Sequence, residues 1–121
     1  MRRWLLSGLM ACVLLLGAAG VHAAEVLQVR SGTVLQVGDH NRTYTVELAC
    51  LTIPPDGDSA AVAWLRSELP RRTKVNLRPL GNDNGTLVAR VQRLGAADHS
   101  ADTDLGAGLV AAGLANAQPG C

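Results

Sequence analysis

The sequence predicts a mainly β fold with two helices, in which five short strands form one small barrel. Short alternating apolar and polar runs, bounded by glycine, proline and asparagine, recur along most of the chain. One helical pattern falls between the third and fourth of these runs, and a second follows the fifth. The chain has 121 residues, of which 48% are hydrophobic and 17% charged, as expected for one globular domain rather than a disordered segment.

The first part of the chain has the composition of a secretory signal peptide. Arg2 and Arg3 form a basic start, and residues 4–20 are apolar and uncharged. Val21 and Ala23 then supply the small residues that a signal-peptide cleavage site needs. We therefore expect cleavage after Ala23 and export of the rest of the chain.

These expectations divide the chain into a signal peptide at residues 1–23 and a domain at residues 24–121. The domain would be periplasmic or secreted, with no membrane attachment after cleavage. Two alternatives remain, an uncleaved membrane anchor and a lipid anchor at Cys12. Removal of Arg2 and Arg3 changes the formal net charge from +1 to −1, so the domain has no overall field that attracts DNA, RNA or anionic lipid.

Cleavage would leave two cysteines, Cys50 and Cys121. An even number of cysteines in a small exported domain favours a disulfide. We expect an intramolecular bond between them that holds the C-terminal stretch across one mouth of the barrel. An intermolecular bridge and two free thiols are the alternatives.

Three predicted strands come first, separated by turns rich in glycine, aspartate and asparagine. They are expected at residues 26–29, 33–37 and 43–51. The third strand alternates most clearly, and its inward face is expected to carry Tyr44, Val46, Leu48 and Cys50.

The second half of the domain begins with a helix, for which Asp58 or Ser59 is the expected N-cap and Pro70 the stop. A second helix near the end of the chain is expected to have Leu105, Leu109 and Val110 on its apolar side, and it is followed by Gly113, the expected C-terminal glycine. The remaining expected elements are a helix at residues 60–69, strands at 73–80 and 86–94, a turn at 81–85 and a helix at 102–112.

The resulting order, β-β-β-α-β-β-α, is that of a five-stranded OB-fold barrel. Many OB barrels bind oligonucleotides, but the fold alone does not establish a function. Aromatic residues make up 2% of this chain. We expect Tyr44 to lie in the core and Trp64 to pack against the barrel, so neither is expected to stack on bases.

Several segments together resemble the staphylococcal nuclease-like (thermonuclease) family. YTVELACLTIPP resembles the family's V-R-L-A-G-I-D-A-P-E, and AAVAWLRSELP followed by TKV resembles A-x-x-x-L-R-x-L-L-P-x-G-T-K-V. LVAAGLA is similar to A-L-V-x-x-G-L-A, and RSGTV stands where the family has D-G-D-T-V. The stretch from Asp83 to Gly95 is similar to D-x-Y-G-R-x-L-A-x-V-x-x-x-G. The resemblance covers most of residues 24–121 in the family order and implies an OB-fold barrel.

The resemblance also implies a catalytic site, and this chain departs from it at every expected position. The family hydrolyses nucleic acid with a calcium-type cation held by acidic residues, a glutamate base and two arginines. Its metal-binding aspartates align with Gly32 and Thr52, and its general base aligns with Pro55. Its two phosphate-binding arginines align with Glu47 and Thr86. The sequence therefore predicts a degenerate member, without these catalytic and metal-binding groups and without a cofactor.

Other motifs are better explained by structure than by chemistry. Asp56, Gly57 and Asp58 are expected to form a turn and a helix cap rather than a metal loop. His40 and His99 are expected at the surface, and the basic cluster at residues 71–74 is expected at a solvated corner between a helix and a strand.

The expected function is that of an exported, monomeric, non-catalytic binding or interaction domain. Its ligand or protein partner is unknown from the sequence. Two alternatives remain open, an active metal-dependent phosphodiesterase with a displaced site and a weak nucleic-acid-binding OB module.

Overall fold

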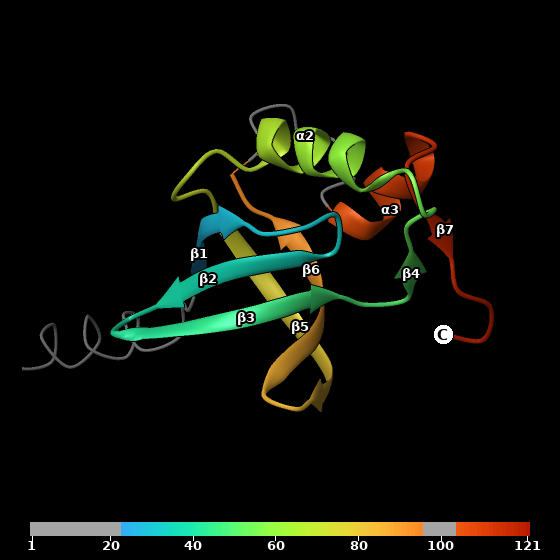
Figure 1. Cartoon of the computed structure of the whole chain (residues 1–121). Helices are drawn as coiled ribbons and strands as arrows, with labels where there is room; N and C mark the ends of the chain where they lie inside the picture. The colour runs from blue at the N-terminus through green and yellow to red at the C-terminus, as the bar shows by residue number, and fades with distance from the viewer. Residues whose placement is uncertain (1–22, 96–103) are drawn as a thin grey trace, which may run out of the picture.

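The computed structural model describes residues 23–95 and 104–121, which form a closed five-stranded barrel with two helices (Figure 1). The predicted fold class is confirmed. The barrel strands are β1 (Ala24–Val29), β2 (Val34–Asp39), β3 (Arg42–Leu48), β5 (Lys74–Asp83) and β6 (Thr86–Arg93). The other elements are α2 (Asp58–Glu68), α3 (Leu105–Ala111) and the short strands β4 (Leu51–Thr52) and β7 (Asn116–Ala117). Residues 1–22 of the expected signal peptide, including Cys12, lie outside the described residues.

The strand order around the barrel is β1-β2-β3-β6-β5, and β5 closes onto β1. Only the β3–β6 pair among these is parallel, with Glu47 beside Val88. This arrangement is that of an OB-fold-like barrel. The inside is filled by aliphatic side chains, and the largest that are fully buried are Leu35, Leu65, Leu109, Val26, Val37, Val46, Val75 and Val91.

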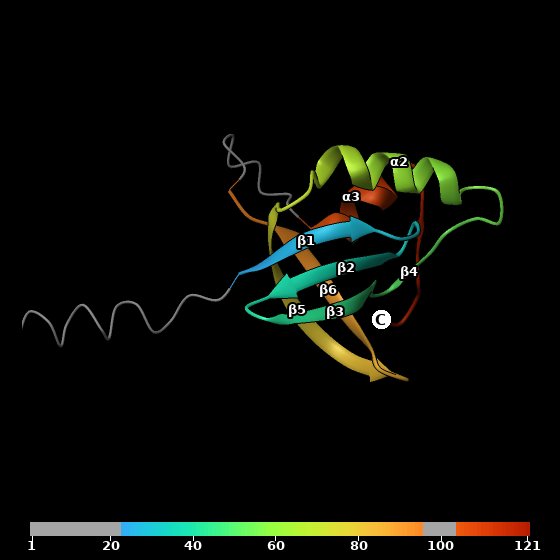
Figure 2. The same cartoon turned by 60° about the vertical axis from the view of Figure 1, so that its left-hand side comes forward.

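The two helices lie side by side over one end of the barrel (Figures 1 and 2). Helix α2 buries Ala61 and Leu65, and α3 buries Leu105 and Leu109, all of which are among the apolar positions that the sequence pattern predicts. Trp64 of α2 packs against Gly108 of α3 as well as on the core. A Cβ at position 108 would lie 2.6 Å from the Trp64 ring, so the glycine allows the two helices to meet.

The third strand is shorter than predicted. It ends at Leu48, and Cys50 has a left-handed backbone with φ 69°, so the chain turns there before β4 begins. Leu48 and its neighbour Ala49 are both buried, which breaks the alternation. The expectation that Cys50 shares a strand face with Val46 is therefore wrong, because the turn takes Cys50 out of the strand.

The hairpin between β5 and β6 is tighter than predicted. Strand β5 continues to Asp83, and the turn consists of Asn84 and Gly85, with φ 51° and 88°. Two central residues with positive φ are typical of the turn that best matches the twist of paired strands. The expected five-residue turn was too long because Gly81 is accommodated within β5, beside a register shift.

The N-terminus of the first helix, α2, differs from the prediction that Asp58 or Ser59 caps it. Helix α2 begins at Asp58 with Gly57 at the N-cap, and no side chain caps it. Helix α3 begins at Leu105 and is capped by Asp104, whose carboxylate accepts a hydrogen bond from the Ala107 N–H. The expected start of this helix at residue 102 lies outside the described residues.

The C-terminal end of α3 is a Schellman motif, as the predicted terminal glycine implies. Gly113 has φ 77°, its N–H binds the Val110 carbonyl, and the Leu114 N–H binds the Leu109 carbonyl. Within the described part of the chain, no helix is long and apolar enough to span a membrane.

Candidate functional site

The loop between β1 and β2 is packed tightly against the start of α2, around Gly32. We call this region the Gly32 corner, and it consists of Gly32, Ile53, Asp58 and Ala61. The Gly32 N–H donates a 2.7 Å hydrogen bond to Asp58 Oδ1. A Cβ at position 32 would lie 2.9 Å from Ala61 Cβ and 3.0 Å from Asp58 Oδ1. The corner therefore has no space for a larger side chain at position 32 unless its neighbours move.

Asp58 has a different role from the predicted one. It does not cap its own helix but joins two segments 26 residues apart. Gly57 takes the cap position instead, because its N–H binds the Pro54 carbonyl and its own carbonyl accepts from Ala61. The acidic pair Asp56 and Asp58 is thus divided between an exposed turn and a hydrogen bond within the fold.

The other four positions of the predicted catalytic set lie at the surface or near it. Thr52 is exposed in β4, and Pro55 is exposed in the turn before α2. Glu47 is exposed in β3, and Thr86 is half-buried at the start of the neighbouring strand β6. Gly32 lies against Ile53, which is the residue after Thr52. Only Glu47 of the five carries an ionisable side chain.

Within residues 23–95 and 104–121, no three His, Cys, Asp or Glu side chains are grouped so as to hold a metal ion. His40 is exposed and lies 3.7 Å from an Asp39 carboxylate oxygen. His99 lies outside the described residues. Arg71, Arg72 and Lys74 are exposed at the corner between α2 and β5, as predicted.

The Cys50–Cys121 disulfide is present, as predicted, with 5.6 Å between the two Cα atoms. The C-terminal stretch is also held next to the disulfide by hydrogen bonds. Strand β7 pairs with β4, and the Gln118 N–H binds the Cys50 carbonyl. Thr52 is therefore covered along one edge by Asn116. The disulfide is not the sole attachment of this stretch, because Ala115 is buried and β7 forms a small sheet with β4.

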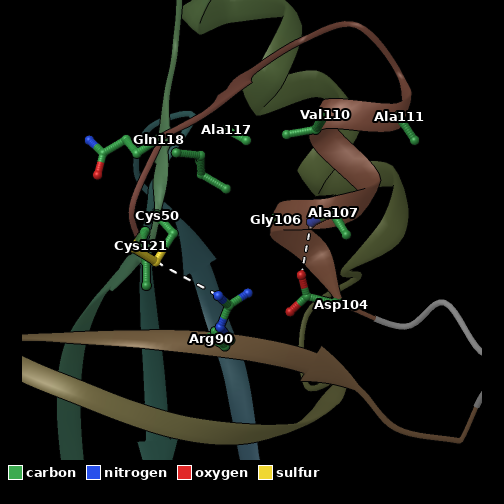
Figure 3. Close-up of a pocket in the computed structure, with 12 residues that line it drawn as sticks. Cys50, Arg90, Asp104, Gly106, Ala107, Val110, Ala111, Ala117, Gln118 and Cys121 are labelled. Atoms are coloured by element: carbon green, nitrogen blue, oxygen red, sulfur yellow. Dashed lines mark hydrogen bonds between the residues drawn. A yellow bond between two sulfur atoms is a disulfide. The ribbon is translucent and has the colours of Figure 1, made fainter.

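A cavity of about 410 Å³ opens between the disulfide, β6 and α3 (Figure 3). We call it the disulfide cavity. Its walls are mostly small or apolar, with a few polar groups. The residues that line it are Ala49, Cys50, Leu51, Arg90, Asp104, Gly106, Ala107, Val110, Ala111, Ala117, Gln118 and Cys121. The volume is within the usual range for small-molecule sites.

Two charged side chains face this cavity from different elements (Figure 3). Arg90 comes from β6, and its Nη2 lies 3.8 Å from Cys50 Sγ. Asp104 is placed beside β6 by a bridge to Gln92, and its Oδ2 accepts a 2.8 Å hydrogen bond from the Ala107 N–H. The cavity thus has a cationic side at Arg90, an anionic side at Asp104 and an apolar wall.

The apolar wall includes a side chain that the sequence pattern placed in the core. Val110 was expected on the buried side of its helix, but it is 37% exposed and lines the cavity. Leu51 of β4 also lines the cavity and packs against Gly106, where a Cβ would lie 2.6 Å from Leu51 Cδ2. The glycine at position 106 therefore lets α3 approach β4.

Sequence reasoning found the two cysteines of this cavity and missed its charged residues. Arg90 occupies an outward position of a predicted strand, where a single basic residue gives no distinctive signal. Asp104 precedes the apolar pattern of α3 and could have been recognised as its N-cap. Neither residue is near the other in sequence, so only the fold brings them together.

Comparison with known proteins adds no assignment. The chain matches no protein-family model, and the search of curated proteins gives no significant match.

Proposed function

We propose that this chain is an exported, non-catalytic OB-fold domain that acts by binding a ligand at the disulfide cavity. We also propose that it is a degenerate relative of the staphylococcal nuclease-like domains. The observation that carries the non-catalytic part is the Gly32 corner. The position where that family holds its first metal ligand is occupied by a buried glycine whose N–H is bound to Asp58.

The packing of the Gly32 corner argues against a metal ion there. A carboxylate at position 32 would need space now taken by Ala61 and by the Asp58 side chain. Two carboxylates so close would also repel each other unless a cation were bound between them. Thr52 and Pro55 supply no carboxylate, and Glu47 places a negative charge where an arginine would bind phosphate.

The disulfide cavity has the features of a binding site. Arg90 can bind a carboxylate through two parallel hydrogen bonds. Val110 and Leu51 offer an apolar surface for an aliphatic group, and the free oxygen of Asp104 can accept from an N–H. A peptide carboxyl terminus with an aliphatic last residue combines a carboxylate, an aliphatic side chain and an amide N–H. We therefore propose a protein or peptide C-terminus as the ligand.

The disulfide supports an exported location. Disulfides persist in oxidising compartments and are uncommon in the cytosol. This agrees with the basic start and apolar run of residues 1–20.

Peptide binding can be measured by NMR with the purified, oxidised protein. The probe is a short acetylated peptide that ends in leucine with a free carboxylate, and its control is the same peptide with an amidated end. We expect saturable shifts for residues that line the disulfide cavity. Amidation or Arg90→Gln should weaken binding by about tenfold or more, because a hydrogen bond between charged groups is lost.

Arg78→Gln is the matched control, because Arg78 is exposed, lies opposite Arg90 on β5 and does not line the cavity. It should leave peptide affinity unchanged. Equal affinity for the free and amidated peptides, or shifts confined to other surfaces, would contradict the proposed ligand.

A further inference from the structure

The two sulfur atoms of the disulfide have different surroundings. Cys121 is exposed, in the stretch that follows β7. Cys50 is half-buried in the turn between β3 and β4, where the Gln118 N–H holds its carbonyl. A thiolate from solution therefore reaches Cys121 Sγ more easily than Cys50 Sγ. The disulfide is accessible on one side and supported by the fold on the other.

Arg90 gives the two sulfur atoms different electrostatic environments, because its positive charge lies beside Cys50 Sγ. Its guanidinium Nη2 lies 3.8 Å from Cys50 Sγ (Figure 3). Neither of the ion pairs found within residues 23–95 and 104–121 involves Arg90. A disulfide sulfur is a weak acceptor, so this contact stabilises the oxidised state little. After reduction the same sulfur can become a thiolate, which a neighbouring arginine stabilises strongly.

We propose that Cys50–Cys121 is a thiol–disulfide exchange site for an external dithiol. Cys121 is the sulfur that is attacked, and Cys50 is the leaving group beside Arg90. Exchange favours attack at the accessible sulfur and departure of the thiol that is more acidic. Here the exposure of Cys121 and the position of Arg90 beside Cys50 both favour attack at Cys121 and departure of Cys50. The proposal does not depend on what the disulfide cavity binds.

The steps balance as two successive exchanges. A thiolate of the dithiol attacks Cys121 Sγ, forming a mixed disulfide, and the electron pair of the broken Cys50–Cys121 bond goes to Cys50 Sγ. The second thiol of the dithiol loses its proton to water and attacks the first sulfur of the dithiol. This releases Cys121 as a thiolate, which takes a proton from water. The dithiol is oxidised to a disulfide, and the protein disulfide is reduced by the same two electrons.

Reduction would change the wall between two cavities. Gln118 and Cys121 line both the disulfide cavity and a neighbouring cavity of about 310 Å³ that includes Glu47. Without the disulfide, Cys121 loses its covalent attachment to the turn at Cys50, while the pairing of β7 with β4 remains. Reduction would therefore leave Gln118 and Cys121, which separate the two cavities, attached by hydrogen bonds alone.

The first test is the equilibrium of the protein with reduced and oxidised dithiothreitol, for the unaltered protein, Arg90→Gln and Arg78→Gln. A free cysteine has a pKa of about 8.5, so cysteine thiolates are well populated near pH 9.5, where the Arg90 guanidinium 3.8 Å from Cys50 Sγ can stabilise a thiolate there. Near pH 9.5, Arg90→Gln should then favour the disulfide by about tenfold, or about 30 mV. At about pH 6 the variant should match the unaltered protein, because the thiolate is not populated there.

Arg78→Gln controls for the loss of one positive charge near the site and should leave the equilibrium unchanged at both pH values. If the equilibrium constant with dithiothreitol is the same for all three proteins near pH 9.5, the proposal is overturned. So would an effect of Arg90→Gln that is equal at both pH values, because that result indicates a packing effect rather than a charge effect.

The second test identifies the attacked sulfur. The oxidised protein is treated with glutathione for a short time, remaining thiols are alkylated, and peptides are mapped by mass spectrometry. We expect glutathione on Cys121 and the alkyl group on Cys50, formed more slowly in Arg90→Gln. Glutathione mainly on Cys50 would contradict the proposal. This test uses the intact disulfide and does not depend on whether a cysteine variant folds.

Discussion

The Gly32 corner and the disulfide cavity lie around the same barrel but are built in opposite ways. The corner is closed by side chains packed against Gly32 and by the hydrogen bond from the Gly32 N–H to Asp58. The cavity stays open because its walls are small residues on α3 and β7, while a disulfide holds one side. One OB-like barrel thus combines a tightly closed corner with an open cavity on another part of its surface.

The largest expected effect on stability comes from removing the Cys50–Cys121 disulfide, which holds one side of the cavity. The bond joins residues 71 apart in sequence, and the chain-entropy model gives about 4 kcal/mol for a loop of this size. We expect Cys50→Ser and Cys121→Ser to lower the free energy of unfolding by similar amounts, approaching this value, in urea titrations. A loss below about 1 kcal/mol for both variants would show that the β4–β7 pairing alone holds this stretch.

The next effect tests whether the Gly32 corner is closed. Gly32→Asp places both volume and charge against Ala61 and Asp58, so we expect a loss of about 3 kcal/mol in the free energy of unfolding. Gly81→Asp is the matched control, because a Cβ there meets nothing within 4 Å and the residue is exposed. Equal stability of the two variants would show that the corner is more open than the packing indicates.

A smaller effect isolates the hydrogen bond within that corner. Asp58→Ala removes the acceptor of the Gly32 N–H, and we expect a loss of about 1 kcal/mol, because the side chain is partly solvated. Asp58→Asn keeps an oxygen at the same place and should lose less. The comparison uses chemical unfolding at one pH. If neither variant lowers the free energy of unfolding, the Asp58 carboxylate is not the group that holds the loop.

The smallest expected signal is binding to single-stranded nucleic acid. Tyr44 is half-buried against the core, and Trp64 packs on Gly108, so neither ring is free to stack on a base. We expect a Kd for oligo-dT weaker than about 1 µM at physiological salt, measured by fluorescence anisotropy. Tighter binding would favour a nucleic-acid-binding OB module over the proposed peptide-binding domain.

The features that the sequence could predict are those that depend on local patterns, and the features that it could not predict depend on how distant segments pack. Alternation and helical periodicity identified the barrel strands and both helices, because those patterns depend on local burial. The cysteine pair was identified by counting the cysteines of the expected exported domain. They did not reveal the turn at Cys50, since a left-handed cysteine has no local sequence signal. The placement of Arg90 beside Cys50 requires the parallel pairing of β3 with β6. Such a contact is determined by topology and not by spacing.

The same reasoning applies to the acidic residues. Asp58 has the sequence position of a helix cap, and only the packing of the β1–β2 loop shows that it binds Gly32 instead. Asp104 does cap its helix, but its position facing Arg90 across a cavity follows from the bridge between Gln92 and Asp104.

The central claim is that this domain binds and does not hydrolyse, and a nuclease assay tests it most directly. Purified protein is incubated with single-stranded DNA and with RNA, in calcium, magnesium or manganese. We expect no cleavage above the buffer control. Losing one catalytic electrostatic group commonly lowers the rate by about 100- to 1000-fold, and under the proposed relationship to the nuclease-like family all five catalytic positions differ. Metal-dependent cleavage that co-purifies with the folded protein and disappears in Glu47→Gln would contradict the claim.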